Sequence, residues 1–162
     1  MEDHEARVRE LLRARKIDDA FHAFLELLQQ PTPPSAKLCS ALIATSAFAK
    51  YVGAAHAAFV AARTSSLAVE PGAASHLVRG HAAAGDLSAA LEVVEYMPAC
   101  ALDVRCLEAL ASAALGAQPR PQPTIARRAL AAIEARGGST ALPREPALGM
   151  VRSLCAAALA RA

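Results

Sequence analysis

The chain has 162 residues, of which 42 are alanine, 4% are aromatic and none is tryptophan. A chain of this length fits one domain, and the excess of alanine over β-branched and aromatic residues disfavours sheets. We therefore expect an all-α protein. The formal net charge is only +2, which excludes both a strongly basic nucleic-acid-binding tail and an acidic disordered segment.

Charge is divided unevenly along the chain. Residues 1–104 carry 9 basic and 12 acidic side chains, a net of −3, whereas residues 105–162 carry 8 and 3, a net of +5. A polyanion is therefore expected to prefer the C-terminal third.

The sequence contains no pattern typical of secretion, of a disulfide framework or of a membrane span. The N-terminal ten residues, MEDHEARVRE, have no apolar stretch and are too acidic for an ordinary transit peptide, so none is visible. The most apolar stretch, residues 38–62, carries Lys50 at its middle, and we expect no membrane span. The four cysteines lack metal-binding spacing and are expected to be reduced. They are Cys39, Cys100, Cys106 and Cys155.

A repeat with a period of 35 residues organises the chain. Three similar apolar segments open at Ile17, Val52 and Leu87, two steps of 35 residues, and a fourth opens at Ile125 after a step of 38. In the first three segments an alanine follows three positions later, and apolar residues then recur at helical spacing. A small residue beside an apolar stripe is typical of a helix that packs closely on another.

Each of these segments is paired with an earlier helical segment across a short break. Gly85 suits the left-handed position that ends a helix, and Asp86 suits the cap of the next one. Proline-containing loops around residues 31–34 and 70–72 separate the pairs. The helices predicted on this basis cover residues 2–15, 17–30, 36–50, 51–66, 73–84, 86–97, 104–117 and 124–136, with a final helix over 145–160.

These helices predict one α-helical repeat domain over residues 1–162. Its helix–turn–helix units cover about 2–34, 35–69, 70–102 and 103–138, and the helix at 145–160 caps the stack. Such units bury their apolar faces by stacking, which predicts a right-handed α-solenoid. Phenylalanines at repeat-equivalent positions are expected in its core. They are Phe21, Phe24, Phe48 and Phe59.

The third unit carries a resemblance to a known family. Its first helix contains Ser75-His-Leu-Val, residues 84–97 read AGDLSAALEVVEYM, and Asp103 closes the unit. With the 35-residue period, this pattern resembles the pentatricopeptide repeat family over about residues 16–118. The tetratricopeptide repeat shares the alanine positions but has a period of 34 residues, and it is the alternative.

The resemblance implies binding of single-stranded RNA in mitochondria or chloroplasts. In the family, one base per repeat is chosen by a side chain of the first helix and by the last residue of the unit. The base-facing residues implied here are Ser40, Glu70, Ser75 and Asp103. The family's aliphatic residue that wedges against the base is replaced by Lys37, Gly72 and Arg105, and Glu108 falls on a base-facing position.

These departures predict that RNA is contacted mostly through its phosphates. The candidate phosphate contacts are basic residues of the first helices and of the C-terminal third. They are Lys37, Arg79, Arg105, Arg120, Arg127, Arg128 and Arg136.

Enzymatic chemistry has little support in the sequence. The HExxH, GxSxG, Walker A and GxGxxG motifs do not occur. His76 and His81 are five residues apart, which is not the i, i+4 spacing that places two metal ligands on one helical face. We therefore expect no catalytic residue, metal, cofactor or small-molecule substrate.

Together with the helical repeat, this resemblance implies a non-catalytic pentatricopeptide-type protein that binds single-stranded or ribosomal RNA. Its expected place is a mitochondrial ribosome or another organellar ribonucleoprotein, with neighbouring proteins as further partners. A protein–protein adaptor with a tetratricopeptide-like concave surface is one alternative. A free organellar RNA processing or splicing factor is another.

Overall fold

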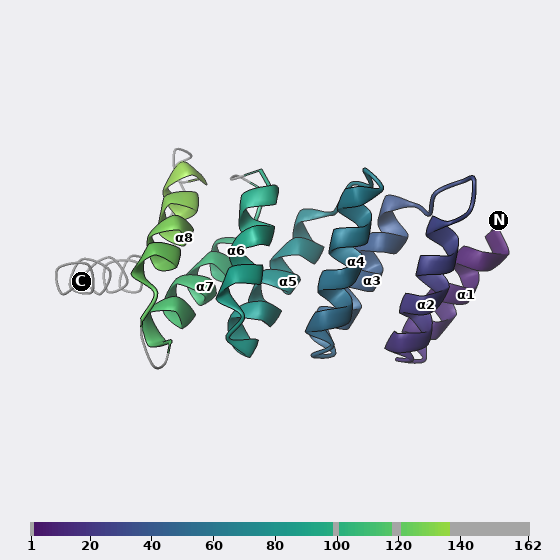
Figure 1. Cartoon of the computed structure of the whole chain (residues 1–162), viewed down its shortest axis with the longest axis horizontal. Helices are drawn as coiled ribbons and strands as arrows, with labels where there is room; N and C mark the ends of the chain where they lie inside the picture. The colour runs from purple at the N-terminus through teal and green to yellow at the C-terminus, as the bar shows by residue number, and fades with distance from the viewer. Residues whose placement is uncertain (1, 99–100, 118–120, 137–162) are drawn as a thin grey trace. The chain divides into compact units, whose positions relative to one another are not determined.

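The computed structural model of the chain describes residues 2–98, 101–117 and 121–136. Within those ranges the protein is all-α: eight helices and no strand are found (Figure 1). The predicted helix at 145–160 lies outside the described residues. The helices are α1 (Glu2–Arg13), α2 (Ile17–Leu28), α3 (Ala36–Phe48), α4 (Val52–Thr64), α5 (Pro71–Ala84), α6 (Leu87–Tyr96), α7 (Val104–Gly116) and α8 (Pro123–Arg136).

The eight helices match those predicted over residues 2–136 in number and order, which confirms their approximate positions, but α1, α2, α3 and α4 each end two residues before the predicted end. Helices α5 and α8 start slightly earlier than predicted, at Pro71 and Pro123. Proline suits the first helical position, because its fixed φ is already helical and its missing N–H has no intrahelical partner there.

The chain divides into two compact units, Met1–Gly80 and His81–Ala162. In the first unit α1 pairs with α2 and α3 with α4, while α1 also packs on α3 and α2 on α4 (Figure 1). Gly80, late in α5, approaches Val52 so closely that an added Cβ would lie 3.3 Å from its side chain. In the second unit α7 pairs with α8, and α6 packs on both. In the first unit, therefore, the first helices of the two pairs lie side by side, and so do the second helices.

The turns inside the helical pairs repeat with the same period as the sequence. Arg15, Lys50 and Gly85 have positive φ angles of 56°, 67° and 81°, and they follow one another at steps of 35 residues. After each of them, a backbone N–H returns to a carbonyl five residues earlier, which is the Schellman ending of a helix. These hydrogen bonds are Lys16 N to Leu11 O (3.0 Å), Tyr51 N to Ser46 O (2.9 Å) and Asp86 N to His81 O (3.0 Å).

The predicted stop and cap at Gly85 and Asp86 are confirmed. Gly85 is left-handed, and the Asp86 carboxylate accepts the N–H of Ala89 at 3.2 Å. Glycine adopts this left-handed conformation without steric cost, because it has no Cβ atom. Lys50 occupies the same place in its own turn and pays the steric cost of its Cβ atom.

Exchanging the residues in these turns should therefore change stability in opposite directions. Lys50→Gly should raise the free energy of unfolding by about 0.5–1 kcal/mol, and Gly85→Ala should lower it by about 1 kcal/mol. Urea denaturation measures both. Gly53→Ala is the matched control, because Gly53 is helical and has open space around its Cβ direction. A loss of stability for Gly53→Ala as large as that for Gly85→Ala would contradict the account.

The aromatic residues are placed as predicted only in part. Phe24 and Phe59 are fully buried and 35 residues apart, and Phe21 is half-buried. Phe48 is 72% exposed, so its predicted core position is wrong. It is the last residue of α3, where Ala47 occupies the buried position, and the apolar stripe has turned away from Phe48.

The apolar stretch at residues 38–62 is split between α3 and α4, which have 13 residues each. A membrane-spanning helix needs about 20 residues. In the described part of the chain, every helix falls short of the length and apolar character that a membrane crossing requires.

Candidate nucleic-acid interface

A groove lies between the first helices of the two pairs in the first unit, α1 and α3. It has a volume of about 320 Å³, and its lining residues are Arg9, Leu12 and Arg13 from α1 and Ala41 and Thr45 from α3. The spacing i, i+3, i+4 places the three α1 residues on one helical face. Leu12 is buried, whereas both arginines are exposed to solvent. The groove therefore combines an apolar lining with two cationic side chains and one hydroxyl.

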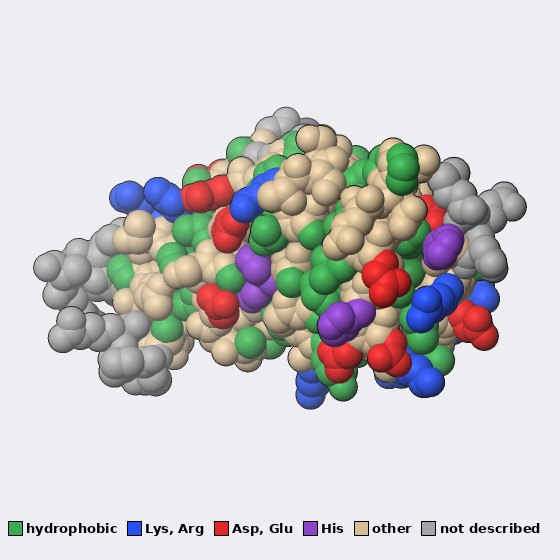
Figure 2. Space-filling view, turned by 45° about the vertical axis from the view of Figure 1, so that its right-hand side comes forward, with side chains coloured by type: hydrophobic (Ala, Val, Ile, Leu, Met, Phe, Trp, Pro, Cys, Tyr) green, Lys and Arg blue, Asp and Glu red, His purple; other side chains and the backbone are tan. Residues whose placement is uncertain are grey.

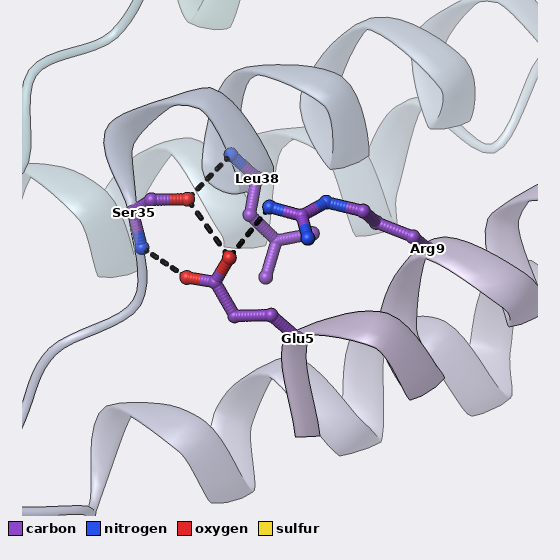
Figure 3. A network of polar contacts seen from close by, with 4 residues as sticks. All are labelled: Glu5, Arg9, Ser35 and Leu38. Carbon is purple, nitrogen blue, oxygen red and sulfur yellow. Dashed lines mark hydrogen bonds and ion pairs between the residues drawn. The ribbon is translucent and has the colours of Figure 1, made fainter. Parts of the chain in front are cut away.

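A polar network joins α1 to the start of α3 beside this groove (Figure 3). The backbone N–H of Ser35 donates to Glu5 Oε1 at 2.7 Å, and the Ser35 hydroxyl donates to Glu5 Oε2 at 3.1 Å. Arg9 Nη2 donates to the same Oε2 at 2.6 Å. Ser35 Oγ also accepts the N–H of Leu38 at 3.3 Å, which caps α3. One carboxylate thus binds a helix cap and a groove arginine.

Arg13 is the second arginine of the groove. Among the described residues it has no hydrogen bond or ion pair, and its side chain is exposed. Its position is one helical turn from Arg9, a rise of about 6 Å along α1. The guanidinium of Arg13 is therefore available to an anion without breaking an internal contact.

The structure brings two of the predicted base-facing residues, Ser40 and Glu70, into contact. The backbone N–H of Glu70 donates to Ser40 Oγ at 2.9 Å. Ser40 is only 2% exposed and Ser75 only 4%, whereas Glu70 and Asp103 are exposed. The Asp103 carboxylate caps α7 by accepting the N–H of Arg105 at 3.2 Å. A base edge could reach the two serine hydroxyls only if the helices around them moved apart.

The Glu5–Ser35 contact is the same interaction one repeat earlier, and it was not predicted from the sequence. Glu5 and Ser35 lie 35 residues before Ser40 and Glu70, and in both pairs a first-helix side chain accepts the N–H of the residue 30 positions later. The positions 35 residues before Ser40 and Glu70 are Glu5 and Ser35, so the repeat period could have identified both residues. The first-helix position therefore has a structural role in two successive pairs.

The predicted phosphate contacts differ in how free their charges are. Lys37, Arg105 and Arg127 are exposed. Arg128 is ion-paired with Glu95, and Arg79 Nη2 lies 2.9 Å from His76 Nδ1. The side chain of Arg136 and the whole of Arg120 lie outside the described residues. On the face that Figure 2 presents, described acidic and basic side chains are interleaved.

Histidine and cysteine chemistry has little geometric support in residues 2–98, 101–117 and 121–136. No group of three His, Cys, Asp or Glu in those ranges could hold a metal ion. Burial raises the pKa of the Cys39 thiol to about 11. The nucleophilic thiolate is therefore scarce at neutral pH. His81 is buried, with its Nδ1 3.7 Å from Asp86 Oδ2.

No known protein-family model and no curated protein sequence matches the chain. Membership of the pentatricopeptide family is a proposal that rests on the 35-residue pattern of the sequence.

Proposed function

We propose that this chain is a non-catalytic, pentatricopeptide-type repeat protein that binds RNA through its phosphates. The observation that carries the proposal is the groove between α1 and α3, where Arg9 and Arg13 are exposed beside Thr45. Guanidinium groups bind phosphate oxygens with paired hydrogen bonds, and a hydroxyl can add a further one. An RNA strand lying in the groove would contact both arginines.

A right-handed α-solenoid is part of this proposal. The recurrence of the left-handed turns at 35 residues supports it, as does the packing of α1 on α3 and of α2 on α4. In such a stack the first helices form one surface and the second helices the other. The arginine groove would then lie on the first-helix surface.

The burial of Ser40 and Ser75 supports contact with phosphates over recognition of bases. Phosphate contacts fix a strand without reading its sequence. A protein that binds RNA in this way needs a structured RNA or neighbouring proteins to define its place. We therefore favour a component of a mitochondrial ribosome or another organellar ribonucleoprotein over a solitary sequence-specific factor.

Binding to single-stranded RNA tests the proposed function. Fluorescence anisotropy with short labelled oligo(U) and oligo(A) should show binding at about 50 mM salt and a steep loss by about 200 mM. The two affinities should agree within about threefold, because the contacts are to the backbone. Absence of binding at the lower salt concentration would contradict the function, and a strong preference for one base would contradict the phosphate mode.

A protein–protein adaptor is the second candidate, and exposed aromatic residues favour it. Phe48 and Tyr51 are 72% and 48% exposed on either side of the turn at Lys50. Exposed aromatic side chains are typical anchors of protein interfaces. A stoichiometric protein partner that co-purifies with the chain and is lost on Phe48→Ser, without any RNA binding, would establish this function instead.

A further inference from the structure

We infer that Glu5 is a positioning residue for RNA binding, which directs Arg9 into the groove and couples it to the wall formed by α3. The inference rests on the proposed function. Glu5 shares its carboxylate between the Arg9 guanidinium, at 2.6 Å, and the N–H and hydroxyl of Ser35, at 2.7 and 3.1 Å (Figure 3).

The contact with Glu5 leaves most of Arg9 available. A guanidinium has five N–H donors, and Glu5 accepts from Nη2. An exposed, untethered arginine samples many rotamers, and ordering it on binding costs free energy. The Glu5 side chain is only 19% exposed and is itself held by Ser35, so it is a fixed anchor. Arg9 is thus oriented before a phosphate arrives.

The same carboxylate also fixes the opposite wall of the groove. Ser35 caps α3, and α3 supplies Ala41 and Thr45 to the lining. Glu5 therefore holds the start of α3 and one arginine of α1 in a single network. Loss of the carboxylate would release Arg9 and loosen the helix that faces it.

Comparison with the next repeats supports a link between Glu5 and Arg9. The residues one period after Glu5 and Arg9 are Ser40 and Ala44, so carboxylate and arginine are replaced together. One period further, Ser75 stands beside Arg79, whose guanidinium lies against His76 instead. A clamp to the next helix needs only a hydroxyl, as Ser40 shows with Glu70. The carboxylate occurs where an arginine one turn away needs an anchor.

Glu5→Gln tests the inference because positioning and simple electrostatics predict opposite signs. Removing a negative charge beside a groove should strengthen binding of a polyanion. If Glu5 positions Arg9, the affinity for single-stranded oligo(U) should instead fall by about threefold. The slope of log affinity against log salt should become shallower, by up to about 0.7, as the Arg9 contact is lost.

Glu10→Gln is the matched control, because Glu10 is an exposed residue of the same helix whose carboxylate has no hydrogen bond or ion pair with a described residue. It should bind oligo(U) as tightly as the wild type or more tightly. Ser35→Ala separates positioning from stability: it should lower Tm through loss of the cap but leave the salt slope unchanged, since Glu5 and Arg9 stay paired.

The outcomes separate the inference from the function. If the wild type binds oligo(U) and Arg13→Gln weakens it, but Glu5→Gln equals Glu10→Gln, the positioning role is overturned and the proposed function stands. The positioning role is also overturned if the slope of log affinity against log salt falls no more for Glu5→Gln than for Ser35→Ala. If the wild type fails to bind, the function and the inference fall together.

Discussion

Replacing either Phe24 or Phe59 with alanine should lower the free energy of unfolding by about 3–5 kcal/mol. Both rings are fully buried, and they lie one period apart in the second helices α2 and α4. Truncation removes apolar contact and leaves a cavity that the helices can fill only in part. The loss for Phe59→Ala should lie at the upper end of this range, because the Arg63 guanidinium lies 6.0 Å from the ring centroid of Phe59. Urea denaturation of the full chain measures the loss.

Phe48→Ala is the control for this pair. The substitution is the same, but Phe48 is 72% exposed, and its replacement should change the free energy of unfolding by no more than about 0.5 kcal/mol. Equal losses at all three positions would contradict the core described here. A loss well below 3 kcal/mol at both Phe24 and Phe59 would contradict it as well.

Replacing both groove arginines, as Arg9→Gln with Arg13→Gln, should weaken binding to single-stranded RNA by at least about tenfold. Each substitution would remove a charge-assisted contact with a phosphate, and glutamine keeps most of the aliphatic stem of arginine. Anisotropy titration with oligo(U) at low salt gives the two dissociation constants. The loss should be the same for oligo(A), since no base is involved.

Arg7→Gln is the matched control for the arginines. Arg7 is exposed on α1, has no hydrogen bond or ion pair with a described residue, and does not line the groove. Arg7→Gln removes one positive charge from the chain, as Arg13→Gln does. If binding depends on the groove, Arg13→Gln should weaken it clearly more than Arg7→Gln. Equal effects would mean that only net charge matters.

Most of the helix boundaries could be predicted from the sequence, because the residues that begin and end helices act locally. Glycine and aspartate at 85–86 and the prolines near 31–34 and 71 mark helix ends by their own backbone preferences, and the helices follow. The left-handed residues Arg15, Lys50 and Ser66 could not be predicted in this way. Arg15 and Lys50 have no preference for positive φ, and only the period places them in register with Gly85.

The arginine groove was not predicted, because its residues become neighbours only when α1 packs on α3. Charge by segment indicated the C-terminal third, yet Arg9 and Arg13 lie in the part of the chain with a net charge of −3. The spacing of the two arginines on one helical face was visible in the sequence. What could not be seen was that Glu5 is engaged by Ser35 and that Thr45 faces them.

Phe48 shows where a repeat pattern misleads. Its apolar type predicts burial, but a helix buries only one stripe, and the end of α3 turns Phe48 outward. Ser40 and Ser75 show the converse, since polar residues assigned to a binding surface are buried. In both cases the position on the helix, set by packing, decides exposure more than the residue type does.

The salt dependence of RNA affinity in the wild type and in the double arginine variant is the most direct test of binding through the α1–α3 groove. Each phosphate contact to a single strand contributes about 0.7 to the slope of log affinity against log salt. The variant with Arg9→Gln and Arg13→Gln should therefore have a slope shallower by about 1.4, whereas Arg7→Gln should leave the slope nearly unchanged. A double variant with the wild-type slope would contradict the account.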